Sequence, residues 1–125
     1  MCIRDSFSTA SDLAVILQML LNGGTYGGER YLKEETIKLF TTRQSENSSR
    51  GIGWDTKNAR YSFSGKLTSM KTFLHTGFTG TSIVVDPARN LVVIFLTNRV
   101  NPTRANSKLT QVRPKVHDTI LQSFE

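Results

Sequence analysis

The sequence predicts an α+β fold in which an antiparallel sheet is flanked by helices near the N-terminal and C-terminal ends. Three observations support this fold class. An apolar stripe with helical spacing runs from Leu13 to Leu21. The segments 82–85 and 91–97 have the apolar patterns of two strands. A second helical stripe lies in residues 112–124. With 125 residues, the chain has room for one small domain, which we place at residues 7–125.

The first helix is predicted to begin at Thr9. Thr9 and Asp12 have the spacing of a capping box, in which side chains satisfy backbone N–H groups that the first helical turn leaves unpaired. Gly23 and Gly24 would end the helix, because glycine adopts the left-handed conformation of a helix C-terminus without strain. The apolar positions recur every three or four residues: Leu13, Ile16, Leu17, Leu20 and Leu21. One face of this helix must therefore be covered by another part of a protein.

The middle of the chain contains weaker signals. A second, shorter helix is predicted over residues 33–42, with Glu34 and Glu35 in its first turn, where the helix dipole favours acidic side chains. Residues 51–55, with the sequence GIGWD, are predicted to form a short strand or an extended segment, in which Trp54 lines the core or a cleft. The segment 58–71 is rich in turn residues.

The two predicted strands should be antiparallel neighbours. In residues 82–85, Ile83 and Val85 alternate with their neighbours, and the Asp-Pro turn that follows is too short for a crossover helix. Residues 91–97 are almost entirely apolar, which predicts a strand buried on both faces. The last helix is expected to place one face against the sheet, with His117 in a structural role. That face contains Val116, Ile120, Leu121 and Phe124.

The charge distribution is uneven. The net charge is +6, and between Asp55 and Asp118 there are ten Lys or Arg residues and a single acid, Asp86. These cations are spread singly, without a basic run and without the interleaved aromatic residues of common nucleic-acid-binding modules, so a solvated basic surface is favoured over a nucleic-acid footprint. Three arginines of this half could line the mouth of a cleft or face water, and we expect them to face water: Arg99, Arg104 and Arg113.

The sequence gives no support for several other classes of protein. Cys2 is the only cysteine, so no disulfide framework can form within the chain. No apolar run approaches the roughly 20 residues of a membrane-spanning helix, and no signal-peptide pattern is present. His75 and His117 lie far apart without an accompanying cluster of acids or cysteines, and the glycines do not form a phosphate-binding loop, so we expect no metal and no cofactor.

Nucleophilic catalysis requires a Ser, Cys or Thr beside a base. Neither Gly-x-Ser-x-Gly nor Ser-x-x-Lys occurs in the chain. The nearest match to the second motif is the segment from Thr68 to Lys71, with threonine in the position of the serine. The segment from Ser45 to Asn47 has the form Ser-x-Asn, but this pattern arises easily by chance in a polar loop.

The most informative stretch is FLHTGFTGTSIVVDPARNLVVIFLTN, residues 73–98. A titratable ring, a hydroxyl group and a glycine, His75-Thr76-Gly77, lie at a strand end just before a glycine turn. Taken singly, His75 could be an ordinary strand-end histidine, and Gly77 with Gly80 could mark only a tight hairpin. Taken together, the three residues could form the wall of an active site.

The ordered segments 7–28, 51–55 and 75–99 resemble the C-terminal third of serine β-lactamases and penicillin-binding-protein-like hydrolases, especially the class C-like esterase and peptidase branch. The resemblance covers about residues 7–124, and its most specific part is the pattern HTGFTG followed by DP, N and LTN. It implies a partial β-lactamase/transpeptidase-like fold.

The resemblance also implies roles for five residues. The family uses the motifs Ser-x-x-Lys, Ser/Tyr-x-Asn and Lys-Thr-Gly, and His75-Thr76-Gly77 matches the third with histidine in place of lysine. The backbone N–H of Phe78 would be one of two donors that stabilise the oxyanion of acyl transfer. His75 would polarise the catalytic cleft. Thr76, Gly77 and Thr79 would bind substrate, with Gly77 allowing the substrate to approach the strand.

The first two motifs have no convincing match, so the resemblance implies that a missing N-terminal portion of the same domain carries them. The substrate of the intact protein would be a small-molecule or peptide acyl compound: an ester, an amide or a β-lactam. We expect the chain to be inactive alone, residues 1–6 to be an unstructured and non-native start, and the helix beginning near Thr9 to expose an apolar face. The family suggests export to the bacterial periplasm or secretion.

Two alternatives remain open at this point. The chain could be a non-enzymatic module that binds a partner through the HTG strand or the basic face. Its basic half could instead bind nucleic acid, in which case the affinity would fall as salt is added, because phosphate contacts release counterions.

Overall fold

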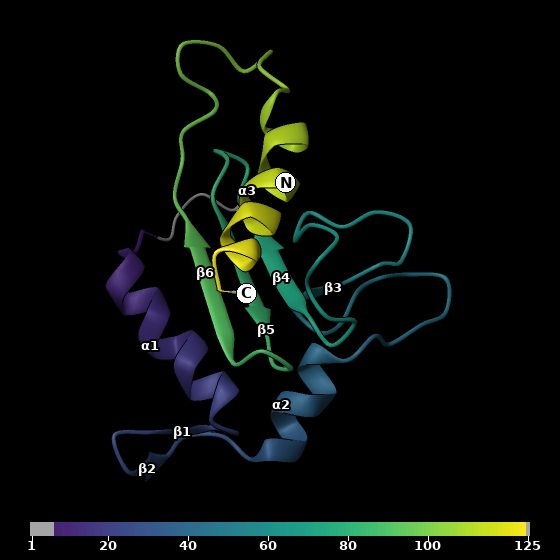
Figure 1. Ribbon diagram of the computed structural model, residues 1–125. Coiled ribbons are helices and arrows are strands. Elements are labelled where there is room, and N and C mark those ends of the chain that lie inside the picture. Colours follow the sequence, from purple (N-terminus) through teal and green to yellow (C-terminus); the bar gives the residue numbers. More distant parts are fainter. Residues whose placement is uncertain (1–6, 125) are drawn as a thin grey trace.

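The computed structural model describes residues 7–124; the expectation for residues 1–6, and Cys2 with them, lies outside this part of the chain. The elements follow in the order α1 (Ala10–Leu21), β1 (Thr25–Tyr26), β2 (Glu29–Arg30), α2 (Glu34–Thr41), β3 (Asp55–Thr56), β4 (Phe73–Thr76), β5 (Ser82–Asp86), β6 (Leu91–Phe95) and α3 (Leu109–Gln122). The α+β class is confirmed (Figure 1). Within residues 7–124, no helix combines the length and apolar character that crossing a bilayer requires.

The main sheet has the strand order β3-β4-β5-β6, and all its neighbours are antiparallel. Phe73 of β4 lies opposite Val85 of β5, and Val85 lies opposite Val92 of β6. The predicted antiparallel pairing across the Asp-Pro turn is therefore correct. Residues 51–55 are predicted to form a short strand or an extended segment; of these only Asp55 lies in a strand, β3, which continues to Thr56 and pairs with β4.

Helix α1 ends as predicted and is capped by Thr9, although only the Thr9 half of the predicted capping box accepts a backbone N–H. The backbone N–H of Asp12 donates to the Thr9 hydroxyl at 3.2 Å, and that hydroxyl donates to the Asp12 carboxylate at 2.8 Å. At the other end, Gly23 has φ +64°, and the N–H of Gly24 donates to the carbonyl of Met19 at 2.9 Å. This is the left-handed glycine termination that the sequence suggests.

The core between α1 and the sheet is small. Leu17 packs against Phe73 and Val85, all three of them buried, and Trp54 contacts Phe73 edge-to-face at a centroid distance of 4.9 Å. Trp54 is thus a core aromatic, one of its two predicted placements.

The apolar stripe of α1 is only partly covered. Leu17 is its one fully buried residue, and Ile16 is 52% exposed; Val15, next to the stripe, is 39% exposed. A broad apolar face of this helix remains accessible to solvent.

Helix α3 crosses the other face of the sheet (Figure 1). Strand side chains alternate between faces, so the buried residues Leu74, Ser82 and Val84 point away from the face covered by α1. The buried residues of α3 are Arg113, His117 and Leu121, spaced four residues apart.

Two expectations for the C-terminal segment are wrong. Phe124 is 72% exposed, because it lies beyond the last residue of α3 and not on its packed face. Arg113 is 5% exposed and does not face water, because its guanidinium group is used inside the fold.

Strand β6 also differs from expectation. Its apolar sequence predicts burial on both faces, yet all five of its residues are only partly buried. The reason is its position: β6 is the last strand in the sheet order, so one of its edges has no strand partner among residues 7–124.

Candidate active site

The predicted site residues lie where β4 runs past its outer neighbour. Strand β3 pairs only with Phe73 and Leu74, so the outer edge of the next two residues, His75 and Thr76, has no strand partner in the described part of the chain. His75 is exposed and Thr76 is half-buried. Because side chains alternate along a strand, the two project to opposite faces of the sheet and flank the open edge.

A tight turn follows this edge. The N–H of Gly77 donates to the carbonyl of Thr81 at 2.8 Å, and the N–H of Gly80 donates to the carbonyl of Gly77 at 3.1 Å. Phe78 is 44% exposed and Thr79 is half-buried. All five predicted site residues are thus contiguous on one strand end and its turn, with the triplet His75-Thr76-Gly77 leading into it.

The fold favours glycine at both positions of this turn, and most strongly at Gly80. Gly80 has φ +114°, and a Cβ built there would lie 2.7 Å from side-chain atoms of both Thr97 and Leu109. A Cβ at Gly77 would collide with the hydroxyl of Thr81. The structure therefore supplies an internal reason for Gly77, and access for a substrate remains a prediction.

A shallow hollow of about 260 Å³ adjoins the turn, between the loop that follows β6 and the beginning of α3. The guanidinium group of Arg99 stacks over the ring of Phe78 at 4.9 Å. Arg113 lines the hollow from α3, and burial lowers the pKa of its guanidinium group, with a smaller contribution from Arg99. The surroundings of the turn are thus cationic.

The near-matches to the other two motifs form no nucleophilic centre. Thr68 is 5% exposed, and its hydroxyl is within 2.9 Å of the hydroxyl of Ser64. Ser69 donates its hydroxyl to Asp86. The hydroxyl of Ser45 accepts the N–H of Asn47 at 3.2 Å in an exposed turn. These contacts stabilise loops, and the carboxylate that accepts the Ser69 hydroxyl has a lowered pKa, which makes it a weak base.

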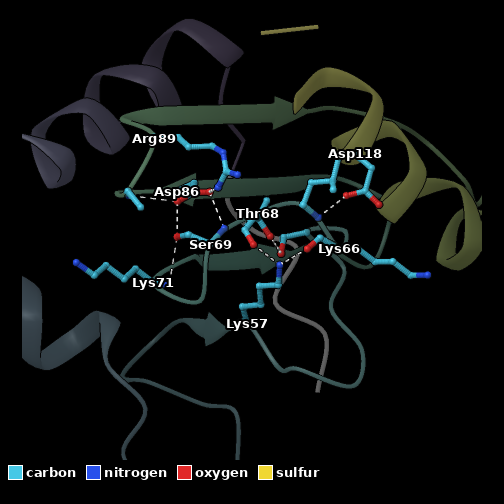
Figure 2. Close-up of polar contacts among 11 residues, drawn as sticks. Lys57, Lys66, Thr68, Ser69, Lys71, Asp86, Arg89 and Asp118 are labelled. Carbon is cyan, nitrogen blue, oxygen red and sulfur yellow. Dashed lines mark hydrogen bonds and ion pairs between the residues drawn. The ribbon is translucent and has the colours of Figure 1, made fainter. Parts of the chain in front are cut away.

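The loop that leads into β4 is tied to the far end of β5 by Asp86 (Figure 2). This carboxylate is 1% exposed and accepts the N–H of Ser69 at 2.8 Å, the hydroxyl of Ser69, the N–H of Ala88 at 3.2 Å and Nη1 of Arg89 at 3.2 Å. Burial raises the pKa of Asp86, but these hydrogen bonds outweigh it, so the net pKa lies below its ordinary value.

Lys57 holds the same loop from the other side. Its ammonium group is buried and donates to the carbonyl groups of Lys66, at 2.7 Å, and of Thr68 (Figure 2). Burial lowers its pKa, although Asp118 and Asp86 act in the opposite direction. Asp118 of α3 accepts the N–H of Leu67 at 2.9 Å. Sequence reasoning missed this framework, because the partners are mostly backbone groups that no motif marks.

The arrangement can bind an extended ligand. An unpaired strand edge offers backbone N–H and C=O groups to a peptide-like backbone, as in β-strand addition. The side chains of His75 and Thr76 add polar groups on either side of that edge. In residues 7–124, His, Cys, Asp and Glu side chains do not gather in threes or more where they could hold a metal ion.

Comparison with known proteins shows which family the chain belongs to. The family described as Beta-lactamase matches residues 4–117. A protein of Escherichia coli K12, provisionally named a D-alanyl-D-alanine carboxypeptidase, is 41% identical over 95 residues, which are 74% of this chain and 22% of that protein. A protein of the same provisional name from Salmonella paratyphi B is 38% identical over 106 residues, or 82% of this chain and 24% of that protein.

A solved structure shares the fold. The crystal structure of a β-lactamase from Mycobacterium bovis superposes with a TM-score of 0.76 at 24% identity, covering 94% of this chain and 44% of that chain. The chain thus spans less than a quarter of the length of the two curated relatives and less than half of the solved structure. From the match over residues 4–117 and the identity to these relatives, the chain belongs to the β-lactamase family.

Proposed function

We propose that this chain supplies one wall of the active site of a β-lactamase-related serine hydrolase, formed by the HTG strand (His75-Thr76-Gly77), together with the oxyanion side of that site. We also propose that the chain is inactive alone. The observation that carries the proposal is the placement of His75-Thr76-Gly77 at an open strand edge that leads into a tight turn. An acyl substrate could align along this edge. The oxyanion that forms during acyl transfer could then receive a hydrogen bond from the turn.

In this proposal the backbone N–H of Phe78 is the oxyanion donor. Such a donor is effective when it is already oriented toward the position where negative charge develops. The side chain of His75 polarises the cleft from one face of the sheet. Thr76, Gly77 and Thr79 contact the substrate.

The substrate class is an acyl compound: an ester, an amide or a β-lactam. The names of the Escherichia coli and Salmonella relatives favour the amide, as the C-terminal bond of a peptide. An extended peptide also suits an open strand edge.

The nucleophilic serine and its base would come from a segment upstream of this chain. Two structural observations support this. The apolar face of α1 exposes Val15 and Ile16 to solvent, and β6 has an unpaired edge among residues 7–124. The relatives are about four times longer than the matched region, which leaves ample length for such a segment.

The test begins with the DNA upstream of codon 1. An open reading frame that encodes Ser-x-x-Lys followed by Ser- or Tyr-x-Asn is expected. The 125-residue chain and the longer product are then treated with a fluorophosphonate probe, which phosphonylates an activated serine with loss of fluoride. We expect labelling of the longer protein alone.

Variants of the longer protein locate the contribution of this chain. Thr76→Val is expected to slow labelling by roughly 10- to 100-fold, in line with the loss of one positioned polar group in a catalytic site. Thr119→Val, on the exposed side of α3, is the matched control and should label at the wild-type rate. Labelling of the 125-residue chain by itself, or a longer protein in which Thr76→Val has no effect, would contradict the proposal.

A further inference from the structure

Every carbonyl group of the turn 77–81 accepts a hydrogen bond. Two of these bonds lie within the turn itself, from Gly80 N–H to the carbonyl of Gly77 and from Gly77 N–H to that of Thr81. The three carbonyl groups between them, of residues 78, 79 and 80, are bound by donors from a different region, the segment 97–113. The turn is therefore held from one side along its whole length.

Arg99 holds the first half of the turn. Its Nε donates to the carbonyl of Phe78 at 2.9 Å, and its backbone N–H donates to the carbonyl of Thr79 at 2.7 Å. The same guanidinium group is anchored by the carbonyl groups of Arg104 and Asn106, which accept from Nη1 at 3.3 and 3.1 Å. One side chain thus connects the turn to the loop after β6.

Arg113 and Thr97 hold the second half. The carbonyl of Gly80 accepts from Nη2 of Arg113 at 2.9 Å and from the hydroxyl of Thr97 at 2.9 Å. Nη2 of Arg113 also lies 3.4 Å from the carbonyl of Thr81. The guanidinium group stacks over the ring of Phe63 at 5.3 Å, which restricts its orientation further.

Neither arginine is used to neutralise an acid. Across the part of the chain that the structure describes, the ion pair present is between Arg89 and Asp86, remote in sequence from both. Arg113 is 5% exposed, and a buried guanidinium group is costly unless hydrogen bonds compensate for the lost water. Its Nη2 donates to carbonyl groups of the turn, whereas its Nε has no hydrogen-bond partner among the described residues, so the turn is the part of the fold that this buried cation binds.

Because each peptide unit is planar, fixing a carbonyl oxygen also fixes the direction of the N–H in the same unit. The carbonyl of Gly77 shares its unit with the N–H of Phe78, and the carbonyl of Phe78 binds Arg99. We propose that Arg99 and Arg113 are positioning residues of the active site, which hold the turn 77–81 so that the Phe78 N–H keeps one direction. This role rests on the proposed function, in which that N–H binds the oxyanion.

The first test uses the 125-residue chain and needs no catalysis. Hydrogen exchange is measured at the amides of Gly77 and Gly80, which are bonded within the turn, and at Val84 in the middle of β5 as an internal reference. Arg113→Met keeps much of the side-chain volume and removes the donors. We expect at least a tenfold rise in exchange at both glycines with less than a twofold change at Val84, and partial recovery in Arg113→Lys.

Matched controls remove a positive charge without touching the turn. Lys115→Met changes a residue on the exposed side of α3. Arg104→Met removes an exposed side chain but keeps the backbone carbonyl of residue 104, which is the group that accepts from Arg99. Both should leave exchange at Gly77 and Gly80 within twofold of wild type. If Arg113→Met does not fold, Arg99→Met gives the same test from the loop side. Unchanged exchange at the two glycines, or an equal rise at all three amides, would overturn the positioning role.

A second readout separates this role from the proposed function. In the longer, active protein, Arg99→Met should lower kcat about tenfold with less than a twofold change in KM, because the oxyanion donor acts in the transition state. A KM effect alone would refute oxyanion positioning. Local loosening of the turn in the 125-residue chain, together with an unlabelled longer protein, would instead refute the proposed function and leave the structural role of the arginines intact.

Discussion

The hydrogen-bond network of Asp86 offers a direct test of what holds strand β4 to the loop that precedes it. The perturbation is Asp86→Asn, which keeps the shape of the side chain and removes its charge. One oxygen of the carboxylate accepts from the Ser69 hydroxyl and the Ala88 N–H, and the other accepts from the Ser69 N–H and Arg89. An asparagine has one acceptor oxygen, so its NH₂ group must face a backbone N–H in either orientation.

The magnitude follows from these partners. One buried backbone N–H loses its acceptor, which costs about 1–3 kcal/mol. The hydrogen bonds that remain lose the assistance of the charge, which adds about 1 kcal/mol. We therefore expect Asp86→Asn to lower the free energy of unfolding by about 2–4 kcal/mol.

The assay is urea unfolding followed by the fluorescence of Trp54, the only tryptophan in the chain. With a slope of about 2 kcal/mol per molar urea, the midpoint should fall by about 1–2 M. The control is Arg89→Met. The Arg89 side chain is 40% exposed, so its ion pair with Asp86 should contribute no more than about 1 kcal/mol.

The pH dependence gives an independent check. Because the folded-state pKa of Asp86 is lowered, its stabilising contribution is present above the unfolded pKa of roughly 4 and is lost as the pH falls through the folded pKa. The difference between wild type and Asp86→Asn should therefore shrink in acid. A loss below about 0.5 kcal/mol at neutral pH would refute the stabilising role of the hydrogen-bond network, and a loss equal to that of Arg89→Met would assign the whole effect to the ion pair.

Three further predictions concern the stability of residues that pack on the sheet or in the turn after β4. Burial lowers the pKa of His117 to about 4, so its neutral form contributes fully to the free energy of unfolding above about pH 6.5. This contribution falls by up to about 3 kcal/mol as the pH drops toward 4, because the unfolded chain then binds the proton more readily. In His117→Phe the urea midpoint should depend less on pH over that range. Gly80→Ala should cost about 1–3 kcal/mol in thermal unfolding, because φ is +114° and the added methyl meets Leu109; an unchanged Tm would refute this geometry. Leu17→Ala should cost about 2–5 kcal/mol in urea unfolding, whereas Val15→Ala, at an exposed position of the same helix, should cost far less.

The local elements were predictable from the sequence, because their signals lie within a few residues of one another. The Thr9–Asp12 cap and the glycine termination of α1 are set by neighbours in the chain. The antiparallel pairing of β5 and β6 follows from the length of the turn between them. The HTG segment was found by its resemblance to a family motif, and its five residues are contiguous.

The errors arose where burial depends on the whole fold. The apolar sequence of β6 suggested a central strand, but its burial depends on which strands lie beside it, and in residues 7–124 one side has none. Phe124 continues an apolar spacing past the end of α3, where it no longer faces the sheet. The apolar character of a residue cannot by itself distinguish a buried position from a partly exposed one, because apolar side chains occur in both.

The sequence by itself determined the α+β class, the helix caps, the hairpins and the order of the site residues, because these depend on local propensity and spacing. Only the tertiary structure decided that Arg113 is buried against the turn, that Lys57 holds the loop before β4, and that Asp86 joins Ser69 across 17 positions. Arg113 and Lys57 bind backbone carbonyl groups, and Asp86 binds backbone N–H groups as well as side chains. Nearly every residue carries these backbone groups, so the choice of partner is made by chain folding and leaves no pattern in the sequence.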